Sequence, residues 1–312
     1  MRFGEVAIRL EGLTKRYGDV AAVDGLTLEV GRGELFGLVG PDGAGKTTTL
    51  RMLAGVLRPT AGEATVLGVS MTRDPEAAKP HLAYMSQRFG LYADLTVREN
   101  IDFYADLYRV PERDRPERLE RLYGFSGLGE FEDRLAGALS GGMKQKLGLC
   151  CALIHRPGIL LLDEPTFGVD PISRRDLWLI VHEMVADGVT VVVSTAYMDE
   201  AERFDRLALM HRGRALTVDS PSSLQDALAG AMLAIEVDRV REAEDIARAH
   251  PEAVRVALFG DRLHVRVAEG VEAGRAIAKA LRAAGLVVHD VRPIAPSLED
   301  VFIDRIGEEE AA

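Results

Sequence analysis

Long apolar runs and basic blocks are both missing from this chain of 312 residues. Its most apolar segments, Gly158–Leu162 and Val189–Ser194, have the length of strands, so we expect no membrane-spanning helix. The N-terminal MRFGEVAIRLEG has no apolar core, which argues against a signal peptide. A net charge of −11, without five or six consecutive Lys or Arg, disfavours binding to nucleic acid.

Cysteine is scarce too, because the two present, Cys150 and Cys151, are adjacent and form neither C-x-x-C nor a His/Cys ligand spacing. We therefore expect two small core residues rather than a metal or redox site. The single tryptophan, Trp178, lies on a predicted amphipathic helix and is also interpreted as core. What remains is a globular composition with 47% hydrophobic and 28% charged residues, enough for one large and one small domain.

Apolar strands alternate with helices along the first part of the chain, which is typical of a parallel sheet covered on both faces. The predicted strands are Val6–Leu10, Leu26–Val30, Leu35–Val39, Ile159–Asp163 and Val189–Ser194, and the predicted helices are Lys46–Leu53, Gly141–Ile154 and Ser173–Ala186. Between them the pattern becomes helical and more charged, and Thr96 and Glu99 form a capping box. We predict an inserted helical subdomain at about residues 93–139.

A second pattern begins near residue 231 and predicts a small α+β domain with a split βαβ order. It comprises strand Leu233–Val237, helix Arg241–Ala249, strands Ala253–Phe259 and Leu263–Val267, helix Val271–Ala284 and strand Leu286–Val291. The acidic residues Glu308–Glu310 are interpreted as a solvated tail. The predicted domains are thus residues 1–230 and 231–312.

A glycine-rich loop stands between a predicted strand and a predicted helix and fits G-x-x-x-x-G-K-S/T. Such a loop turns its backbone N–H groups toward a phosphate chain, and the helix N-terminus adds positive charge. Lys46 can reach the β- and γ-phosphates, and the Thr47 hydroxyl can ligate Mg²⁺. The predicted phosphate-binding residues are Gly40, Pro41, Asp42, Gly43, Ala44, Gly45, Lys46, Thr47 and Thr48.

Two acids end the apolar strand Ile159–Asp163, at the sheet edge where such folds bind ligands. Asp163 would hold the metal, directly or through water, and Glu164 would point toward an attacking water. This pair is a weak signal alone, but it lies about 115 residues after the phosphate loop, which strengthens it.

A second anion-binding helix start occurs at Leu139–Lys146, where Ser140, Gly141 and Gly142 precede a strong helix. One ATP cannot need two phosphate-binding helix starts from the same subunit unless one of them serves a neighbour. This segment therefore predicts a site shared between two subunits.

The order GPDGAGKT, SQ, LSGGMKQK, LLLDEP and GVDP resembles the ABC-transporter ATPase over about 220 residues. The resemblance implies a P-loop α/β core with a helical subdomain, with ATP and Mg²⁺ as cofactors. Tyr17 would stack on adenine, and Gln87 would contact Mg²⁺ and the attacking water. Ser140 and Gly142 would contact the other subunit's γ-phosphate, Gly141 between them would also bind nucleotide, and Asp170 would cross the dimer interface. Metal ligands would be Thr47, Gln87 and Asp163, and catalytic residues Glu164, Gln87 and Lys46.

Three segments narrow the resemblance to bacterial exporter ATPases, which work with a separate membrane permease: Met143–Lys146, Tyr197–Glu202 and Pro296–Phe302. The partners would be that permease and a second ATP-binding subunit, identical or different, at the cytoplasmic face of the membrane. Substrates in that group are drugs, antibiotics, lipids or polysaccharides. The alternative is a soluble ABC ATPase of translation or DNA repair, which usually has tandem cassettes, coiled-coil insertions or basic arms. A P-loop kinase or GTPase would not need LSGG.

One position departs from the family, because Ala196 stands where a histidine usually contacts the γ-phosphate. Three hypotheses remain open. The site hydrolyses slowly, Glu164 suffices with Thr195 or water filling in, or an asymmetric pair supplies one intact site. Removal of one transition-state donor costs about 10²–10³ in rate.

Overall fold

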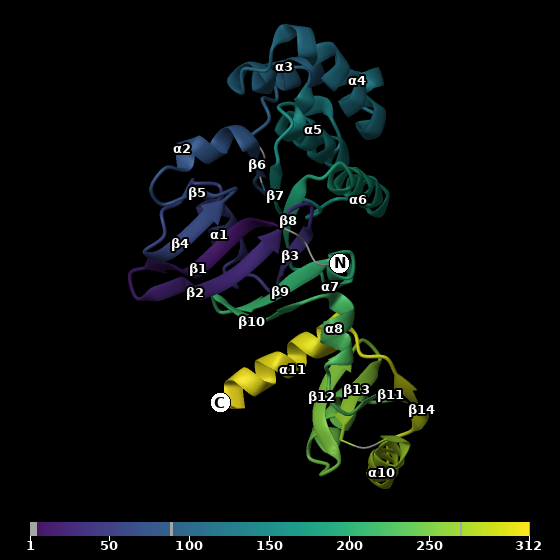
Figure 1. The fold of residues 1–312 in the computed structure, drawn as a ribbon. Coiled ribbons are helices and arrows are strands. Elements are labelled where there is room, and N and C mark those ends of the chain that lie inside the picture. The colour runs from purple at the N-terminus through teal and green to yellow at the C-terminus, as the bar shows by residue number, and fades with distance from the viewer. Residues whose placement is uncertain (1–4, 88–89, 269, 312) are drawn as a thin grey trace. The chain divides into compact units, whose positions relative to one another are not determined.

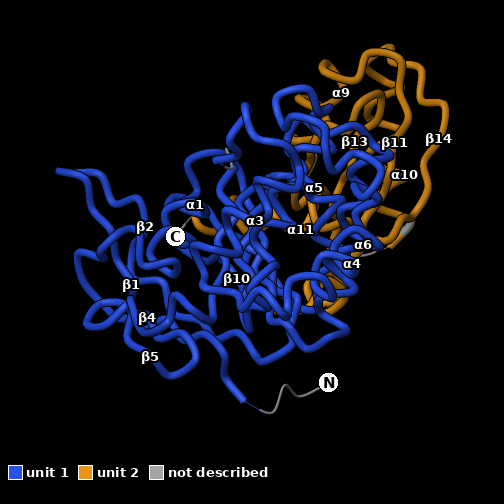
Figure 2. Tube along the Cα trace, turned by 90° about the horizontal axis from the view of Figure 1, so that it is seen from above, with its two compact units in different colours: residues 1–218 blue, residues 219–312 orange. Residues whose placement is uncertain are grey.

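The computed structural model describes residues 5–87, 90–268 and 270–311. The chain divides into two compact units, Met1–Val218 and Asp219–Ala312 (Figure 2). This division precedes the predicted boundary at 230/231, because helix α8 (Pro221–Asp226) contacts the last helix of the second unit. The first four residues of the N-terminal stretch, for which no signal peptide is expected, lie outside the described residues.

The first unit is built on a six-stranded sheet with the order β10-β9-β3-β8-β7-β6 (Figure 1). Its parallel pairs are β9–β3, β3–β8, β8–β7 and β7–β6. Every residue of β3, β7 and β8 is buried, as expected for strands covered on both faces. The strands are β3 (Leu35–Val39), β6 (Leu82–Met85), β7 (Ile159–Asp163), β8 (Thr190–Thr195), β9 (Arg206–His211) and β10 (Arg214–Asp219).

A second, antiparallel sheet has the order β2-β1-β4-β5. Its strands are β1 (Val6–Tyr17), β2 (Val20–Gly31), β4 (Ala61–Val66) and β5 (Val69–Ser70). The predicted strands Val6–Leu10 and Leu26–Val30 cover less than half of β1 and β2. Register shifts along this pair interrupt the alternation of apolar and polar residues. Long strands are therefore not recognised from a strict period of two.

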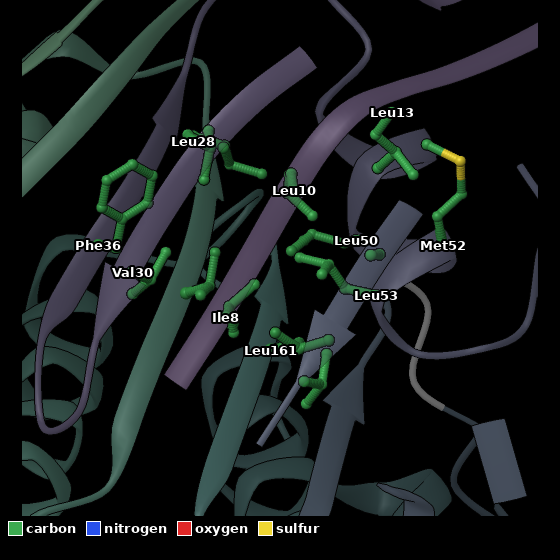
Figure 3. Close-up of a cluster of buried hydrophobic side chains, with 14 of the residues drawn as sticks. Ile8, Leu10, Leu13, Leu28, Val30, Phe36, Leu50, Met52, Leu53 and Leu161 are labelled. Carbon is green, nitrogen blue, oxygen red and sulfur yellow. The ribbon is translucent and has the colours of Figure 1, made fainter. Parts of the chain in front are cut away.

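The main hydrophobic core joins the two sheets to helix α1 (Lys46–Leu53), whose bounds match the prediction. Figure 3 shows side chains from both sheets meeting those of α1. They include Ile8, Leu10, Leu13, Leu28, Val30, Phe36, Leu50, Met52, Leu53 and Leu161. Each such buried side chain contributes about 1.5–3 kcal/mol, so the helix that follows the phosphate loop is fixed to the sheet.

The predicted helical segment leaves and rejoins the core at adjacent points. The Gly137 N–H donates to the Ala93 carbonyl at 2.9 Å, and the Ala136 N–H donates to the Leu95 carbonyl at 2.8 Å. Helix α3 (Val97–Leu107) begins with the predicted capping box of Thr96 and Glu99, and α4 (Arg115–Ser126) follows. The other helices of this unit are α2 (Pro75–Ala78), α5 (Gly141–Leu153), α6 (Pro171–Ala186) and α7 (Met198–Ala201).

Cys150, Cys151 and Trp178 are fully buried, which confirms their interpretation as core residues. Within the described part of the chain, no helix combines the length and the apolar character that crossing a membrane requires.

The second unit is a four-stranded antiparallel sheet with the order β12-β13-β11-β14, the predicted split βαβ arrangement. Its elements are β11 (Ala231–Val237), α9 (Val240–Arg248), β12 (Ala253–Phe259), β13 (Arg262–Val267), α10 (Gly270–Ala283), β14 (Val288–Ile294) and α11 (Leu298–Ala311). Helix α11 was not predicted, and Glu308–Glu310 belong to it rather than to a free tail. Ser297 accepts a hydrogen bond from the Asp300 N–H, and Leu298, Val301 and Phe302 supply an apolar face. The sequence therefore does contain the N-cap and the apolar pattern that indicate a helix.

Candidate nucleotide site

The phosphate loop, Gln87 and Glu164 line one cavity of about 700 Å³ in the first unit. Its described lining is Val20, Ala21, Ala22, Asp42, Gly43, Ala44, Gly45, Lys46, Thr47, Thr48, Gln87, Glu164 and Arg212. Gly45 has φ 99°, and a Cβ there would lie 2.4 Å from the Ala22 carbonyl oxygen. A larger residue at this position would push the loop away from β2.

The ammonium group of Lys46 is buried and held at the loop, with 4% of the residue exposed. Its Nζ donates to the carbonyls of Gly40 at 2.7 Å and Pro41 at 3.1 Å. It also lies 3.4 Å from Oε1 of Glu164. A buried charge is costly unless it is paired, and these contacts stabilise the Lys46 ammonium group. The group can exchange them for a stronger anionic partner.

Asp163 is 1% exposed and accepts hydrogen bonds from three hydroxyl groups. Its Oδ1 accepts from Thr47 Oγ1 at 2.9 Å and Ser194 Oγ at 2.7 Å, and its Oδ2 accepts from Tyr84 Oη at 3.2 Å. Burial and the nearby Asp163 carboxylate raise the pKa of Tyr84 to about 12, so its hydroxyl keeps its proton. Sequence reasoning missed Ser194 and Tyr84.

Glu164 follows Asp163 in a left-handed backbone conformation with φ 48°. Its N–H donates to the Ser194 carbonyl at 3.1 Å and to Ser194 Oγ at 3.0 Å, which holds this strained turn. Its carboxylate accepts from Gln87 Nε2 at 2.9 Å. A non-glycine residue in this region costs about 1–3 kcal/mol and tends to occur at functional sites. The turn sends the Glu164 side chain into the cavity while that of Asp163 stays buried.

The contacts of Thr195 bear on the hypothesis that Thr195 or water fills in for the missing histidine. The buried Thr195 hydroxyl donates to Glu200 at 2.8 Å and accepts from the Tyr197 N–H at 3.0 Å. It is therefore engaged away from Glu164, and in this structure Thr195 does not fill in for the histidine. Ala196 itself is exposed.

Tyr17 does not reach the cavity in this structure. It is 52% exposed and pairs with Val20, which does line the cavity, across the β1–β2 turn. Ser140, Gly141 and Gly142 are likewise absent from the described lining.

The predicted second anion site is held against the start of α6. Ser140 caps α5 by accepting from the Met143 N–H at 3.3 Å, and Asp170 caps α6 by accepting from the N–H groups of Ile172 and Ser173. A Cβ on Gly142 would lie 2.2 Å from Ser173 Oγ. Because Gly142 has no side chain, the N-termini of α5 and α6 can pack together.

Four lining residues were missed by the sequence analysis. Val20, Ala21 and Ala22 belong to β2, and no motif marks them. Arg212 lies in the turn between β9 and β10, and its sequence gives only a turn signal, Arg-Gly.

A parallel sheet whose strand β3 leads through a glycine-rich loop into α1, with an acid pair ending β7, defines a P-loop nucleotide-binding protein. The family model for ABC transporters matches residues 23–167. The model for the C-terminal domain of ATP-binding proteins like DrrA1-3 matches residues 220–306.

Relatives match over nearly the whole chain. "Probable multidrug ABC transporter ATP-binding protein YbhF" of Escherichia coli (strain K12) is 42% identical over 97% of this chain, which spans 52% of that protein. "Daunorubicin resistance ATP-binding protein DrrA2" of Streptomyces coeruleorubidus is 35% identical, over 96% of this chain and 95% of the relative. The chain belongs to the family of ABC transporter ATP-binding proteins.

Solved structures of this family also resemble the chain. The "Structure of ATP binding subunit of ABC transporter" aligns with a TM-score of 0.65 and 28% identity, covering 70% of this chain and 92% of the other. A dimeric ATP-binding cassette in a post-hydrolysis state, bound to ADP and Pi, aligns with a TM-score of 0.63 and 25% identity, covering 68% of this chain and 98% of the other.

Proposed function

We propose that this chain binds and hydrolyses ATP to drive a separate permease that exports a small molecule. The observation that carries the proposal is the convergence of Lys46, Thr47, Gln87 and Glu164 on one cavity, with Asp163 bonded to Thr47 behind them. These side chains supply phosphate binding, water activation and metal binding.

Hydrolysis would begin with an exchange of partners at Lys46. The ammonium group now lies against Glu164 and two carbonyls, and the phosphates of ATP are stronger anionic partners. When Lys46 turns to the phosphates, Glu164 is released to accept a proton from the attacking water. Gln87 donates to Glu164 and thereby orients its carboxylate toward that water.

The residues present fit a magnesium site. Thr47 and Asp163 offer hydroxyl and carboxylate oxygens, the donors that Mg²⁺ prefers, and Gln87 offers an amide oxygen nearby. Thr47 and Asp163 would hold the ion together with phosphate oxygens, with Gln87 as a further ligand. When bound, Mg²⁺ would neutralise charge on the β- and γ-phosphates.

The working unit is proposed to be a dimer. Ser140, Gly141 and Gly142 form an anion-binding helix start that does not line this subunit's cavity, so it is available to the ATP of a partner. The solved cassette that resembles this chain is dimeric with ADP and Pi. The adenine-stacking role of Tyr17 also stays a proposal. Tyr17 would reach the adenine when the dimer closes around the nucleotide.

A groove beside the Gln87 segment is the proposed docking site for the permease, which would hold the chain at the membrane. It has a volume of about 680 Å³ and combines exposed apolar side chains with charges. Val56 is 67% and Leu107 60% exposed. Its lining is Ala54, Val56, Glu76, Lys79, Pro80, Leu82, Tyr84, Leu107, Tyr108 and Arg109. Tyr84 also donates to Asp163, so the groove is connected to the nucleotide site.

We propose that the exported molecule is a drug, an antibiotic, a lipid or a polysaccharide. This proposal is based on the relatives, whose names refer to multidrug transport, daunorubicin resistance and Nod factor export. A soluble ATPase of translation or DNA repair is not favoured by these relatives. The test is phosphate release by the purified chain with ATP and Mg²⁺, alone and with its permease in vesicles. Absence of ATP binding and turnover in a folded preparation would overturn the proposal.

A further inference from the structure

Arg212 forms part of the wall of the nucleotide cavity, although it belongs to no phosphate-binding motif. It lies in the tight turn between β9 and β10, with φ 46°, and is followed by the buried Gly213. A non-glycine residue is uncommon in this left-handed region. The conformation is thus imposed by the surroundings of the turn.

Backbone hydrogen bonds fasten this turn to the phosphate loop at Ala44 and to strand β2 at Asp24. The Gly213 N–H donates to the Ala44 carbonyl at 3.1 Å, and the Asp24 N–H donates to the Gly213 carbonyl at 2.9 Å. A Cβ on Gly45 would lie 3.4 Å from the Gly213 Cα. Arg212, the residue before Gly213, is therefore held beside the middle of the phosphate loop, where a phosphate chain would lie.

The charges of the cavity make Arg212 important. Among the described residues that line it, the cations are Lys46 and Arg212, and the acids are Asp42 and Glu164. These four charges cancel, and Lys46 already faces Glu164 at 3.4 Å. Without Arg212 the lining would carry a net negative charge, which opposes the binding of a polyanion.

We propose that Arg212 is a nucleotide-binding residue that pairs with the phosphate chain. This inference deepens the proposed function and rests on it. A guanidinium presents its N–H groups in a rigid fork that matches phosphate oxygens, whereas lysine offers a point charge. Arg212 adds this second cation from a turn that lies more than 160 residues after Lys46.

The test measures equilibrium binding of ATP, ADP and adenosine to the full chain, for wild type, Arg212→Ala, Arg212→Lys and Arg214→Ala. Arg214 is the matched control, because it lies in the same turn region, is engaged by Asp24 at 2.6 Å and does not line the cavity. We expect Arg212→Ala to weaken ATP and ADP by about tenfold, the worth of one charge-assisted hydrogen bond. Adenosine affinity should stay within about twofold, and Arg212→Lys should recover part of the loss.

Steady-state kinetics provide a second readout. Arg212→Ala should raise KM for ATP by a similar factor with little change in kcat, because Glu164 and Gln87, the residues proposed to activate the water, are unchanged in this variant. Equal affinities for wild type and a folded Arg212→Ala would overturn the inference, as would an equal loss for adenosine. If Lys46→Ala lost ATP binding in the same series, the proposed function would stand while the inference failed. A folded wild type that bound no ATP would overturn both.

Discussion

Gln87 donates a hydrogen bond to Glu164 across 2.9 Å between Nε2 and Oε2, so a residue from the segment after β6 holds the proposed base at the end of β7. The same Glu164 carboxylate lies 3.4 Å from Lys46 Nζ. It is therefore fixed from two sides before any nucleotide enters. Substitutions at this carboxylate should separate ATP binding from hydrolysis.

Glu164→Gln should retain ATP binding and slow hydrolysis by about 10²–10⁴, because an amide cannot accept the proton of the attacking water. ATP would then persist, and the variant should form a more stable dimer with ATP and Mg²⁺ than wild type. Size-exclusion chromatography with light scattering measures this. Glu130→Gln, at an exposed position on another segment, is the control. A variant that remains monomeric with ATP would count against ATP-driven dimerisation of the isolated chain.

Lys46→Ala should abolish turnover and sharply weaken ATP binding, because it removes the cation that is held at the loop by Gly40 and Pro41. Phosphate release and equilibrium binding report the two effects. Lys279→Ala, on the exposed face of α10, should behave as wild type. Hydrolysis at the wild-type rate in Lys46→Ala would show that the active site has been misplaced.

Ala196→His should raise ATPase activity, by up to about 10². The structure supports this expectation, since the Thr195 hydroxyl is bonded to Glu200 rather than turned to the cavity. Steady-state hydrolysis beside wild type, with Glu164→Gln as the blank, measures the gain. No change would indicate that water or a partner subunit supplies the missing contact. A folded variant with lower activity would mean that the pocket has been rebuilt around alanine.

Removal of the second unit should leave nucleotide affinity within about twofold, because the described residues that line the cavity all lie in the first unit. The variant should end at Asp219, the last residue of β10. Ending at residue 230 instead keeps α8 without α11 and exposes Leu224, which is buried in the full chain. We expect this second variant to be less stable. Lost affinity in a folded 1–219 variant would make the second unit part of the site.

The stability of the protein should fall as the pH drops from about 6.5 to 4. Burial lowers the pKa of His155 from 6.5 to about 4, and the ring stacks on Tyr108 with centroids 3.8 Å apart. Between these values the unfolded chain binds a proton that the folded chain does not. The stabilisation is thus complete above pH 6.5, and about 1–3 kcal/mol is lost toward pH 4.

His155→Phe keeps an aromatic ring against Tyr108 and removes the titration. Its thermal unfolding should depend less on pH in this window than that of wild type. His289→Phe, at an exposed position of β14, should retain the wild-type dependence. Equal pH dependence in wild type and His155→Phe would show that His155 is not responsible.

The phosphate loop and its helix could be predicted from the sequence because their signals are local. Leu35–Val39, Lys46–Leu53 and Ile159–Asp163 have the predicted bounds. The turn of each of these motifs is encoded within a few residues, so no distant contact alters it.

Other parts of the site could not be predicted, because they depend on how distant segments meet. Ser194 reaches Asp163 through the parallel register of β7 and β8, which sequence alone does not give. Arg212 reaches the cavity because its turn bonds to Ala44.

The bonds from Gly137 to Ala93 and from Ala136 to Leu95 give the helical segment between them two ends at almost the same place. Whatever fills that span can change in length without disturbing the register of either sheet, since each doubling of a closed loop costs only about 0.6 kcal/mol. A helical segment from another protein could therefore be transplanted between residues 93 and 137, provided that it presents an apolar face to α5. In such a chimaera the part of the fold that binds nucleotide could be kept while the part around α3 and α4 is exchanged.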